Sequence, residues 1–408
     1  MQTPRVYRRI PVALSTVVIA IAMFSISSRA QTLTTLHDFR VGEGKEPGSS
    51  LALAGGAFYG VLSAGGSGFG SVYKFSNGSL TILHSFTEKG PIPPSNLLAD
   101  AAGNIYGVAY FGGTHASGMV YKVDPGGNFS VLYNFCSTKG CLDGQYPNGG
   151  LAIDAAGNLY GTATSGGSSG WGTVFRLAPD GQETVLYNFC SVSENCPDGR
   201  NPQAPVIVDT AGNVYGSTFN GGTDFYGYGV VFKVDPSGVQ TVLHTFSGWS
   251  DGAFPDGSLI RDRSGNLYGV TYEGGNGPGV VFKLDTSGTL TVLYNLCSEA
   301  KCSDGAQPQG GLLRSPDGSF YGSASTGGDE NCNPPIGCGT VFKLTSTGVF
   351  TVLHTFHYED GAAPLGNLIM GSGGTLFGVT YLGGNISNIR CIAPEQGLGC
   401  GTIFEINP

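Results

Sequence analysis

The sequence predicts an all-β fold, a seven-bladed β-propeller with four-stranded blades, and three observations support this prediction. An aromatic-Gly pair recurs seven times with a Gly-Gly pair six residues after the aromatic, at a period of roughly 50 residues. The 408 residues include 69 glycines, yet 40% are hydrophobic, which fits many short strands joined by tight turns. A strand motif absent from the last repeat stands ahead of the first. The aromatic residues of the pairs are Tyr59, Tyr106, Tyr160, Tyr215, Tyr268, Tyr321 and Phe377.

Each repeat contains four short segments rich in β-branched, aromatic and aliphatic residues, bounded by turn signals. The first two are joined by a turn like Asp154–Asn158, and the last two by a turn like Ala178–Gly181. Both turns keep nearly the same length in every repeat, and a late glycine suits the positive φ of a hairpin. In the third repeat the predicted strands are Leu151–Asp154, Asn158–Ala163, Thr173–Leu177 and Glu183–Phe189.

The other two connections behave differently. The loop after each Gly-Gly pair varies in length, and an acidic-Gly-x-x-Pro element joins each blade to the next. From its Pro to the next aromatic-Gly pair is 13 residues in six repeats and 12 in the first. In a four-stranded blade these two connections share one face, which we call the variable face. Binding sites commonly lie on variable loops that a rigid scaffold positions, so this face is the functional candidate. The clear copies of the element begin at Asp143, Asp198, Asp251, Asp304 and Asp360, with looser copies at Glu43 and Lys89.

The two ends of the chain predict how the ring closes. The last repeat has no fourth strand, whereas Thr34–Phe39 carries the Leu-His-x-Phe motif of that strand before any complete repeat. Pairing it with Thr402–Ile406 would complete the seventh blade and remove an open sheet edge.

The N-terminus predicts a secretory signal peptide. Three arginines in the first nine residues precede an apolar run from Ile10 to about Ile26, and the small residues Ser28 and Ala30 precede Gln31. An uncleaved membrane anchor is the alternative, for which the run is short. We therefore expect a signal peptide over residues 1–30, a single propeller domain over 31–408, and a protein that is secreted, periplasmic or extracellular without a membrane span after cleavage.

The charge balance excludes one class of partner. Only 12% of residues are charged and the net charge is −9, without the basic stripe that nucleic acid or an anionic membrane surface requires. We expect no nucleic-acid partner, and we expect a monomer.

The ten cysteines fall into five local couples, which an exported chain should oxidise to disulfides. No C-x-x-C spacing occurs and no histidine keeps step with the couples, so no metal site is predicted. The couples are Cys136/Cys141, Cys190/Cys196, Cys297/Cys302, Cys332/Cys338 and Cys391/Cys400.

The histidines and repeated acids are interpreted as architecture. Four histidines share one position of the Leu-His-x-Phe strand, where other repeats have Tyr, and such a position favours a part-buried ring with a polar tip. His115 and His357 lie on the variable face without a neighbouring carboxylate in sequence. The shared position holds His37, His84, Tyr133, Tyr187, His244, Tyr294 and His354.

The acids of the Asp-Gly-x-x-Pro elements are expected to cap their own turns. Calcium bound by Asp143, Asp198, Asp251, Asp304 and Asp360 is the alternative, but no D-x-D-x-D-G loop supports it, and we expect no cofactor.

Aromatic residues on the variable face form the candidate binding site. Exposed rings flanked by Asn, Asp and Gly can stack on sugar rings or contact a protein partner, whereas packing of loops over the propeller mouth is the structural alternative. The candidate ligand-binding residues are Trp171, Trp249, Tyr146, Phe225, Tyr226, Tyr228, Phe254 and His115.

The segment from Asn158-Leu159-Tyr160-Gly161 through Gly166-Gly167 to Gly172-Thr173-Val174-Phe175 resembles the GloVer-type tandem repeat of exported bacterial proteins. The resemblance covers all seven repeats and implies a secreted or surface protein with no assigned activity, so no catalytic residue is carried over. We expect an exported module that binds extracellular glycan or protein through the variable face. The alternative is a propeller hydrolase or lyase acting on polysaccharide at the central mouth, which needs a titratable group near the axis that breaks the repeat symmetry.

Overall fold

The computed structural model describes residues 31–40, 42–48, 50–65, 69–86, 96–384 and 399–408, and the expected signal peptide lies outside them. Residues Gln31–Pro408 form one compact unit. Within the described ranges no helix has both the length and the apolar character needed to cross a membrane.

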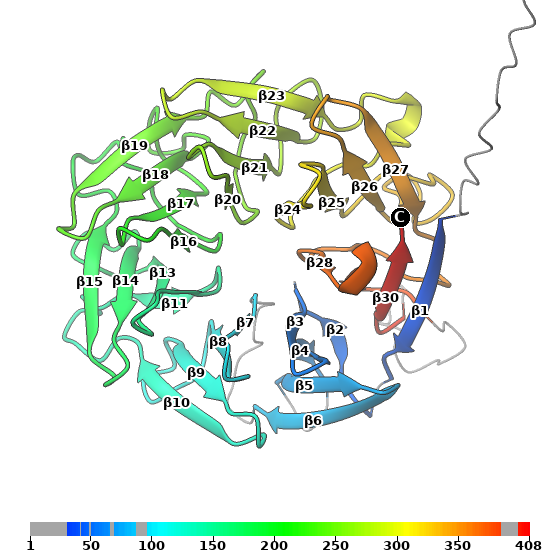
Figure 1. The fold of residues 1–408 in the computed structure, drawn as a ribbon. Coiled ribbons are helices and arrows are strands. Elements are labelled where there is room, and N and C mark those ends of the chain that lie inside the picture. The colour runs from blue at the N-terminus through cyan, green and yellow to red at the C-terminus, as the bar shows by residue number, and fades with distance from the viewer. Residues whose placement is uncertain (1–30, 41, 49, 66–68, 87–95, 385–398) are drawn as a thin grey trace, which may run out of the picture. The chain divides into compact units, whose positions relative to one another are not determined.

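Seven antiparallel sheets follow one another around a central axis (Figure 1), which confirms the predicted propeller. Short strands such as β7, β16 and β28 lie near the axis, and long ones such as β10, β19 and β1 form the rim. Two 3-10 turns, Ala300–Cys302 and Ser372–Gly374, are also described. By blade, the strands are β2 (Lys45–Pro47), β3 (Ala52–Ala54), β4 (Ala57–Ala64), β5 (Ser71–Ser76) and β6 (Ser79–Ser85); β7 (Leu98–Ala99), β8 (Ile105–Ala109), β9 (Met119–Val123) and β10 (Phe129–Asn134); β11 (Gln145–Pro147), β12 (Ala152–Ile153), β13 (Leu159–Ser165), β14 (Thr173–Leu177) and β15 (Glu183–Asn188); β16 (Ile207–Val208), β17 (Val214–Thr218), β18 (Val230–Val234) and β19 (Gln240–Thr245); β20 (Ile260–Arg261), β21 (Leu267–Thr271), β22 (Val280–Leu284) and β23 (Leu290–Asn295); β24 (Leu313–Arg314), β25 (Phe320–Ala324), β26 (Thr340–Leu344) and β27 (Phe350–Thr355); and β28 (Ile369–Met370), β29 (Leu376–Thr380), β30 (Thr402–Asn407) and β1 (Thr32–Asp38).

The blade connections pair more extensively than the sequence indicated. In the third blade the Gly-x-x-Pro segment forms β11, in which Gln145 pairs with Ser165 and Pro147 with Ala163 of β13. Single bridges at the same place tie the connections of the four following blades, for example Ala253 to Glu273. Segments this short carry no alternation of polar and apolar residues, so their pattern does not reveal them.

The ring closes as predicted. The N-terminal strand β1 pairs antiparallel with β30, from Thr32 opposite Asn407 to Asp38 opposite Thr402. The seventh sheet is therefore completed by residues from both ends of the described chain (Figure 1).

Close packing explains both repeated glycine motifs. A Cβ on Gly161 would lie 2.6 Å from the ring of Phe175 on β14, so the aromatic-Gly pair makes room for this ring. Gly166 has a φ of 77°, and a Cβ there would lie 2.8 Å from the Cα of Gly144 in the blade connection. Glycine is the residue that tolerates both demands.

Aromatic rings hold neighbouring blades together. The Phe that ends the fourth strand packs against the third-strand ring of the next blade, as Phe135 does against Phe175 with ring centroids 5.0 Å apart. The same contact joins Phe189 to Phe232 at 5.0 Å. These rings are fully buried and form the core between the blades.

The turns of the opposite face are stabilised by a repeated set of hydrogen bonds. Asp154 accepts bonds from the backbone N–H and side-chain amide of Asn158 and from the Tyr160 hydroxyl, the last at 3.0 Å. Burial opposes the ionised form of Asp154, but these donors lower its pKa below the usual value. The same hydrogen bonds recur around Asp100, Asp209 and Asp262.

Candidate functional site

The acid of each blade connection accepts a hydrogen bond from the ring that ends the preceding blade. The carboxylate of Asp143 accepts from the Tyr133 hydroxyl at 2.8 Å, from the Ser137 backbone N–H at 2.8 Å and from the Thr138 hydroxyl at 2.7 Å. Burial opposes ionisation, but these donors lower the pKa of Asp143. We call the acids held in this way the outer acids: Glu43, Asp143, Asp198, Asp251, Asp304 and Asp360.

This arrangement confirms the interpretation of the shared His and Tyr position. Histidine and tyrosine reach the acid equally well, at 3.0 Å for His244 to Asp251 and 2.8 Å for Tyr294 to Asp304. His84 differs because the connection after it begins with Lys89, which lies outside the described residues. Instead, the His84 ring stacks on Phe129 with centroids 3.7 Å apart, and burial lowers its pKa.

Where the calcium alternative would place a cation, protein donors already contact the carboxylates of Asp143 and Asp198. The oxygens of Asp143 face N–H and O–H donors. Oδ2 of Asp198 accepts from Tyr187 and from the backbone of Ser191, whereas its Oδ1 is buried without a partner among the described residues. A cation would have to displace these donors. Over the described part of the chain, no cluster of three or more His, Cys, Asp or Glu is placed to hold a metal.

Four of the five expected disulfides are present, and three of them enclose donors of an outer acid. Cys136 pairs with Cys141, and Ser137 and Thr138, which bind Asp143, lie between them. The predicted partner of Cys400, Cys391, lies outside the described residues. The four described pairs are Cys136–Cys141, Cys190–Cys196, Cys297–Cys302 and Cys332–Cys338.

The predicted aromatic residues separate into three groups. Tyr146 stacks on Tyr110 with centroids 5.0 Å apart. Phe254 stacks on Phe219 at 4.9 Å and contacts the edge of Tyr228. Both groups bridge adjacent blades, so their rings serve packing between blades as well as lining the variable face.

The third group surrounds a buried cation. The guanidinium of Arg200 lies over the Phe225 ring, 3.9 Å from its centroid, and over Trp171 at 4.8 Å. Arg200 also donates to the Phe225 carbonyl at 2.6 Å. Tyr226, beside Phe225, is 79% exposed and presents the accessible ring of this group.

Two predicted residues join none of these groups. Trp249 is 76% exposed, and His115 is exposed with Thr114 as its side-chain partner. On the same face His357 lies 3.3 Å from the carboxylate of Asp329. This imidazole is 57% exposed and does not line the axial cavity, so it does not supply the axial titratable group that the enzyme alternative needs.

A polar cavity of about 210 Å³ lies on the propeller axis. Four of the residues that line it each directly follow the Pro of a blade connection: Asn148, Gln203, Asp256 and Gln309. These residues link the variable-face connection to the innermost strand, so the cavity lies toward the variable face. Among the described residues, none of these four side chains has a hydrogen-bonded protein partner.

Two positions further along each repeat, polar groups bond to one another across the axis. The Asn367 amide donates to the Ser258 hydroxyl at 2.7 Å, and the Asn367 backbone N–H donates to Ser50 at 2.9 Å. Ser50 in turn donates to Asn96. Asn96, Ser258 and Asn367 of this network line the same cavity as the four side chains.

Asp256 breaks the repeat symmetry at the axis and is therefore the axial titratable group that the enzyme alternative needs. Its counterparts in the other lining repeats are amides or Leu365, and Asp256 is the one ionisable residue among those that line the described cavity. Burial raises its pKa to about 6. Tyr272 is a titratable group close enough to interact with Asp256. Its pKa is raised by burial, by Glu273 and by Asp256.

The sequence reasoning missed these axial residues. The signal was present in the rigid spacing between the Pro and the aromatic-Gly pair, which holds the residue after each Pro at one radius of the ring. Because this residue differs from repeat to repeat, a search for repeated motifs passes over it.

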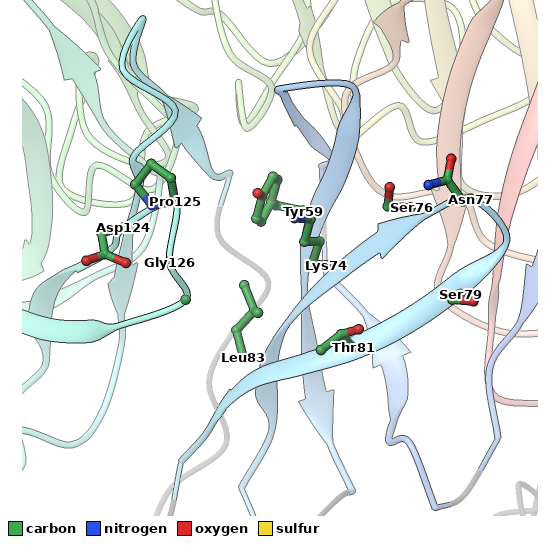
Figure 2. Close-up of a pocket in the computed structure, with 11 residues that line it drawn as sticks. Tyr59, Lys74, Ser76, Asn77, Ser79, Thr81, Leu83, Asp124, Pro125 and Gly126 are labelled. Atoms are coloured by element: carbon green, nitrogen blue, oxygen red, sulfur yellow. The ribbon is translucent and has the colours of Figure 1, made fainter.

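A second cavity, of about 460 Å³, lies between the first two blades on the face of the invariant turns (Figure 2). Tyr59 and Lys74 line one side, and Asp124, Pro125 and Gly126 form the other. Its position was not anticipated, because the sequence favoured the variable face.

Fold and repeats define a β-propeller built from one tandem motif. The sequence profile of the Gloeobacter/Verrucomicrobia repeat matches residues 22–155 and 146–392. The chain belongs to this repeat family. No curated protein matches the sequence.

Solved structures support the fold. The extracellular domain of BT3049 from B. thetaiotaomicron, described as a hybrid two-component system, matches 92% of this chain with a TM-score of 0.54 and 12% identity. That of BT4673 from the same organism, described as a one-component system, matches 92% with a TM-score of 0.55 and 10% identity. The matches span only 41% and 40% of those chains. A gluconolactonase from Xanthomonas campestris has 16% identity over 71% of this chain and 78% of its own, but its TM-score of 0.40 carries no argument.

Proposed function

We propose that the protein is an exported binding module that holds part of an extracellular glycan at the variable-face end of its axis. The observation that carries this proposal is the set of three amides and one carboxylate around the axial cavity, whose polar atoms have no protein partner among the described residues. Sugar hydroxyls both donate and accept hydrogen bonds, and amides do the same.

The size of the cavity favours a small polar group. At about 210 Å³ it is below the ~300–1,000 Å³ of pockets that hold drug-sized ligands, so it suits a single ring or the end of a longer chain. The exposed Tyr226 and Trp249 on the same face can stack on further rings.

Binding is favoured over hydrolysis by the count of acids at the axis. Most glycosidases place two carboxylates on either side of the scissile bond. Asp256 has no second carboxylate in the described lining of the cavity. The disulfides and the extracellular domains of similar fold support export.

A glycan array and a polysaccharide pull-down, with and without EDTA, test the proposal. We expect binding that does not depend on metal and that falls about tenfold or more when Gln203 and Gln309 are both replaced by Ala, because each removes hydrogen bonds. The matched control is Gln182→Ala, an exposed amide on the opposite face. A blank screen with folded protein would refute glycan binding, and release of shorter sugars would establish the hydrolase or lyase alternative.

Replacing Trp171 and Trp249 by Ala distinguishes ligand binding across the variable face from binding confined to the axial cavity. If the ligand extends over the face, loss of Trp249 weakens binding without unfolding, because this ring is exposed. Trp171 packs on Arg200, so its loss also lowers stability. Unchanged affinity in both variants would restrict the site to the axial cavity.

A further inference from the structure

Asp256 carries a charge for which the fold provides no partner. Each outer acid is met by a ring donor, but none of the described Lys, Arg or His residues contacts the Asp256 carboxylate, and no hydrogen bond to it is present. A carboxylate that is partly withdrawn from water in a cavity, without a counter-charge, is unfavourable, and buried charges are ordinarily paired.

Resting on the proposed function, we propose that the glycan held at the axis bears a protonated amine, as a sugar with a free amino group does, and that Asp256 binds this ammonium. A bound cation would replace the water that the carboxylate has lost and form a charge-assisted hydrogen bond. An ammonium has three donors, and the carbonyl oxygens of Asn148, Gln203 and Gln309 are acceptors in the same cavity.

The surroundings of Asp256 favour a cation over an anion. The other groups at this level are uncharged amides and Leu365, and the nearby Tyr272 hydroxyl, whose pKa is raised above its ordinary value, is neutral at ordinary pH. Glu273, next to Tyr272, adds negative charge. The net charge of the whole chain, −9, also attracts cationic ligands. Asp256 itself is mostly ionised above pH 6, where its pKa lies.

The test compares chitosan oligosaccharides, which carry free amines, with chitin oligosaccharides of equal length, in which the amines are acetylated. Isothermal titration at pH 7 should show the chitosan form binding at least about tenfold more tightly. Asp256→Asn should remove this preference, whereas Glu359→Gln, which removes an exposed negative charge in a blade connection, should retain it.

Two results would overturn the inference while leaving the proposed function intact. One is equal or stronger binding of the acetylated form. The other is binding of neutral glycans from the array when neither oligosaccharide binds. Retention of the amine preference in Asp256→Asn would also overturn the role of this residue. If no glycan of any kind binds folded protein, the proposed function fails together with the inference.

Discussion

Asp143 and Asp256 lie in equivalent connections of different blades, four residues before and one residue after the Pro, and their surroundings are opposite. Asp143 is buried among donors from Tyr133, Ser137 and Thr138, which lower its pKa. Asp256 has no such donor among the described residues, and burial raises its pKa. The first acid recurs around the ring together with its donor, whereas the second occurs once. Repetition identifies the acid that holds blades together, and the exception identifies the acid available to a ligand.

Removing a whole strand of the rim should have the largest effect. Without residues 32–39 the seventh sheet loses β1 and exposes the edge of β30, and the His37 to Glu43 contact is lost. We expect loss of a single cooperative transition in urea, followed by fluorescence and circular dichroism. A truncated protein that unfolds in one transition near the original midpoint would show that the ring does not depend on this closure.

Asp143→Ala should destabilise strongly, because it leaves the Tyr133 hydroxyl and the loop donors without their acceptor. We expect about 3 kcal/mol less free energy of unfolding, against a change within about 0.5 kcal/mol for the exposed Asp180→Ala. A folded-state pKa below the unfolded one means that this stability is present above the unfolded pKa, about 3.9, and lost as pH falls. Equal effects of the two variants at pH 7 would contradict the architectural role.

Asp256→Asn should instead stabilise the protein. Its folded-state pKa of about 6 exceeds the unfolded value of about 3.9, so the folded protein binds more protons between these values and loses stability as pH rises through them. Urea unfolding should show a gain of about 2 kcal/mol for the variant at pH 7.5 and almost none at pH 4. Destabilisation at pH 7.5 would indicate that Asp256 has a protein partner after all.

Glu183→Gln should give a smaller gain in the free energy of unfolding and no change in ligand binding. Glu183 lies at the seam near Asp143, its Oε1 is buried without a partner in the described structure, and burial together with Asp143 raises its pKa to about 7. Stability again falls as pH rises from about 4.3 to 7, but the longer side chain can turn toward water, so we expect about 1 kcal/mol at pH 8. A change in glycan affinity would show that an unpaired acid need not face the axial cavity to affect the ligand.

The fold could be predicted because its determinants repeat. The Gly161 and Gly166 positions are imposed by packing against Phe175 and Gly144, and such steric demands leave the same residue at the same spacing in each blade. The closure by β1 followed from a missing strand and a surplus one. The turns and the disulfide couples could also be predicted, because each is formed by residues close together in sequence.

The axial site could not be predicted from repeated motifs. Asn148, Gln203, Asp256 and Gln309 come together only when seven blades close, and they are far apart in sequence. The aromatic hypothesis found residues on the variable face, but composition could not distinguish Trp171, which packs on Arg200, from the exposed Trp249. Only contacts between blades separate these two roles.

The closing pair of strands has a consequence for biosynthesis. β1 comes first and β30 last among the described strands, yet each is the other's neighbour, so Thr32 is paired only after Asn407 has been made. Until then six sheets can form in order while the first strand is exposed as a template for other chains. Such long-range contacts slow folding. A circular permutant that carries β1 after β30 would remove this delay, because every blade would then be assembled from contiguous chain.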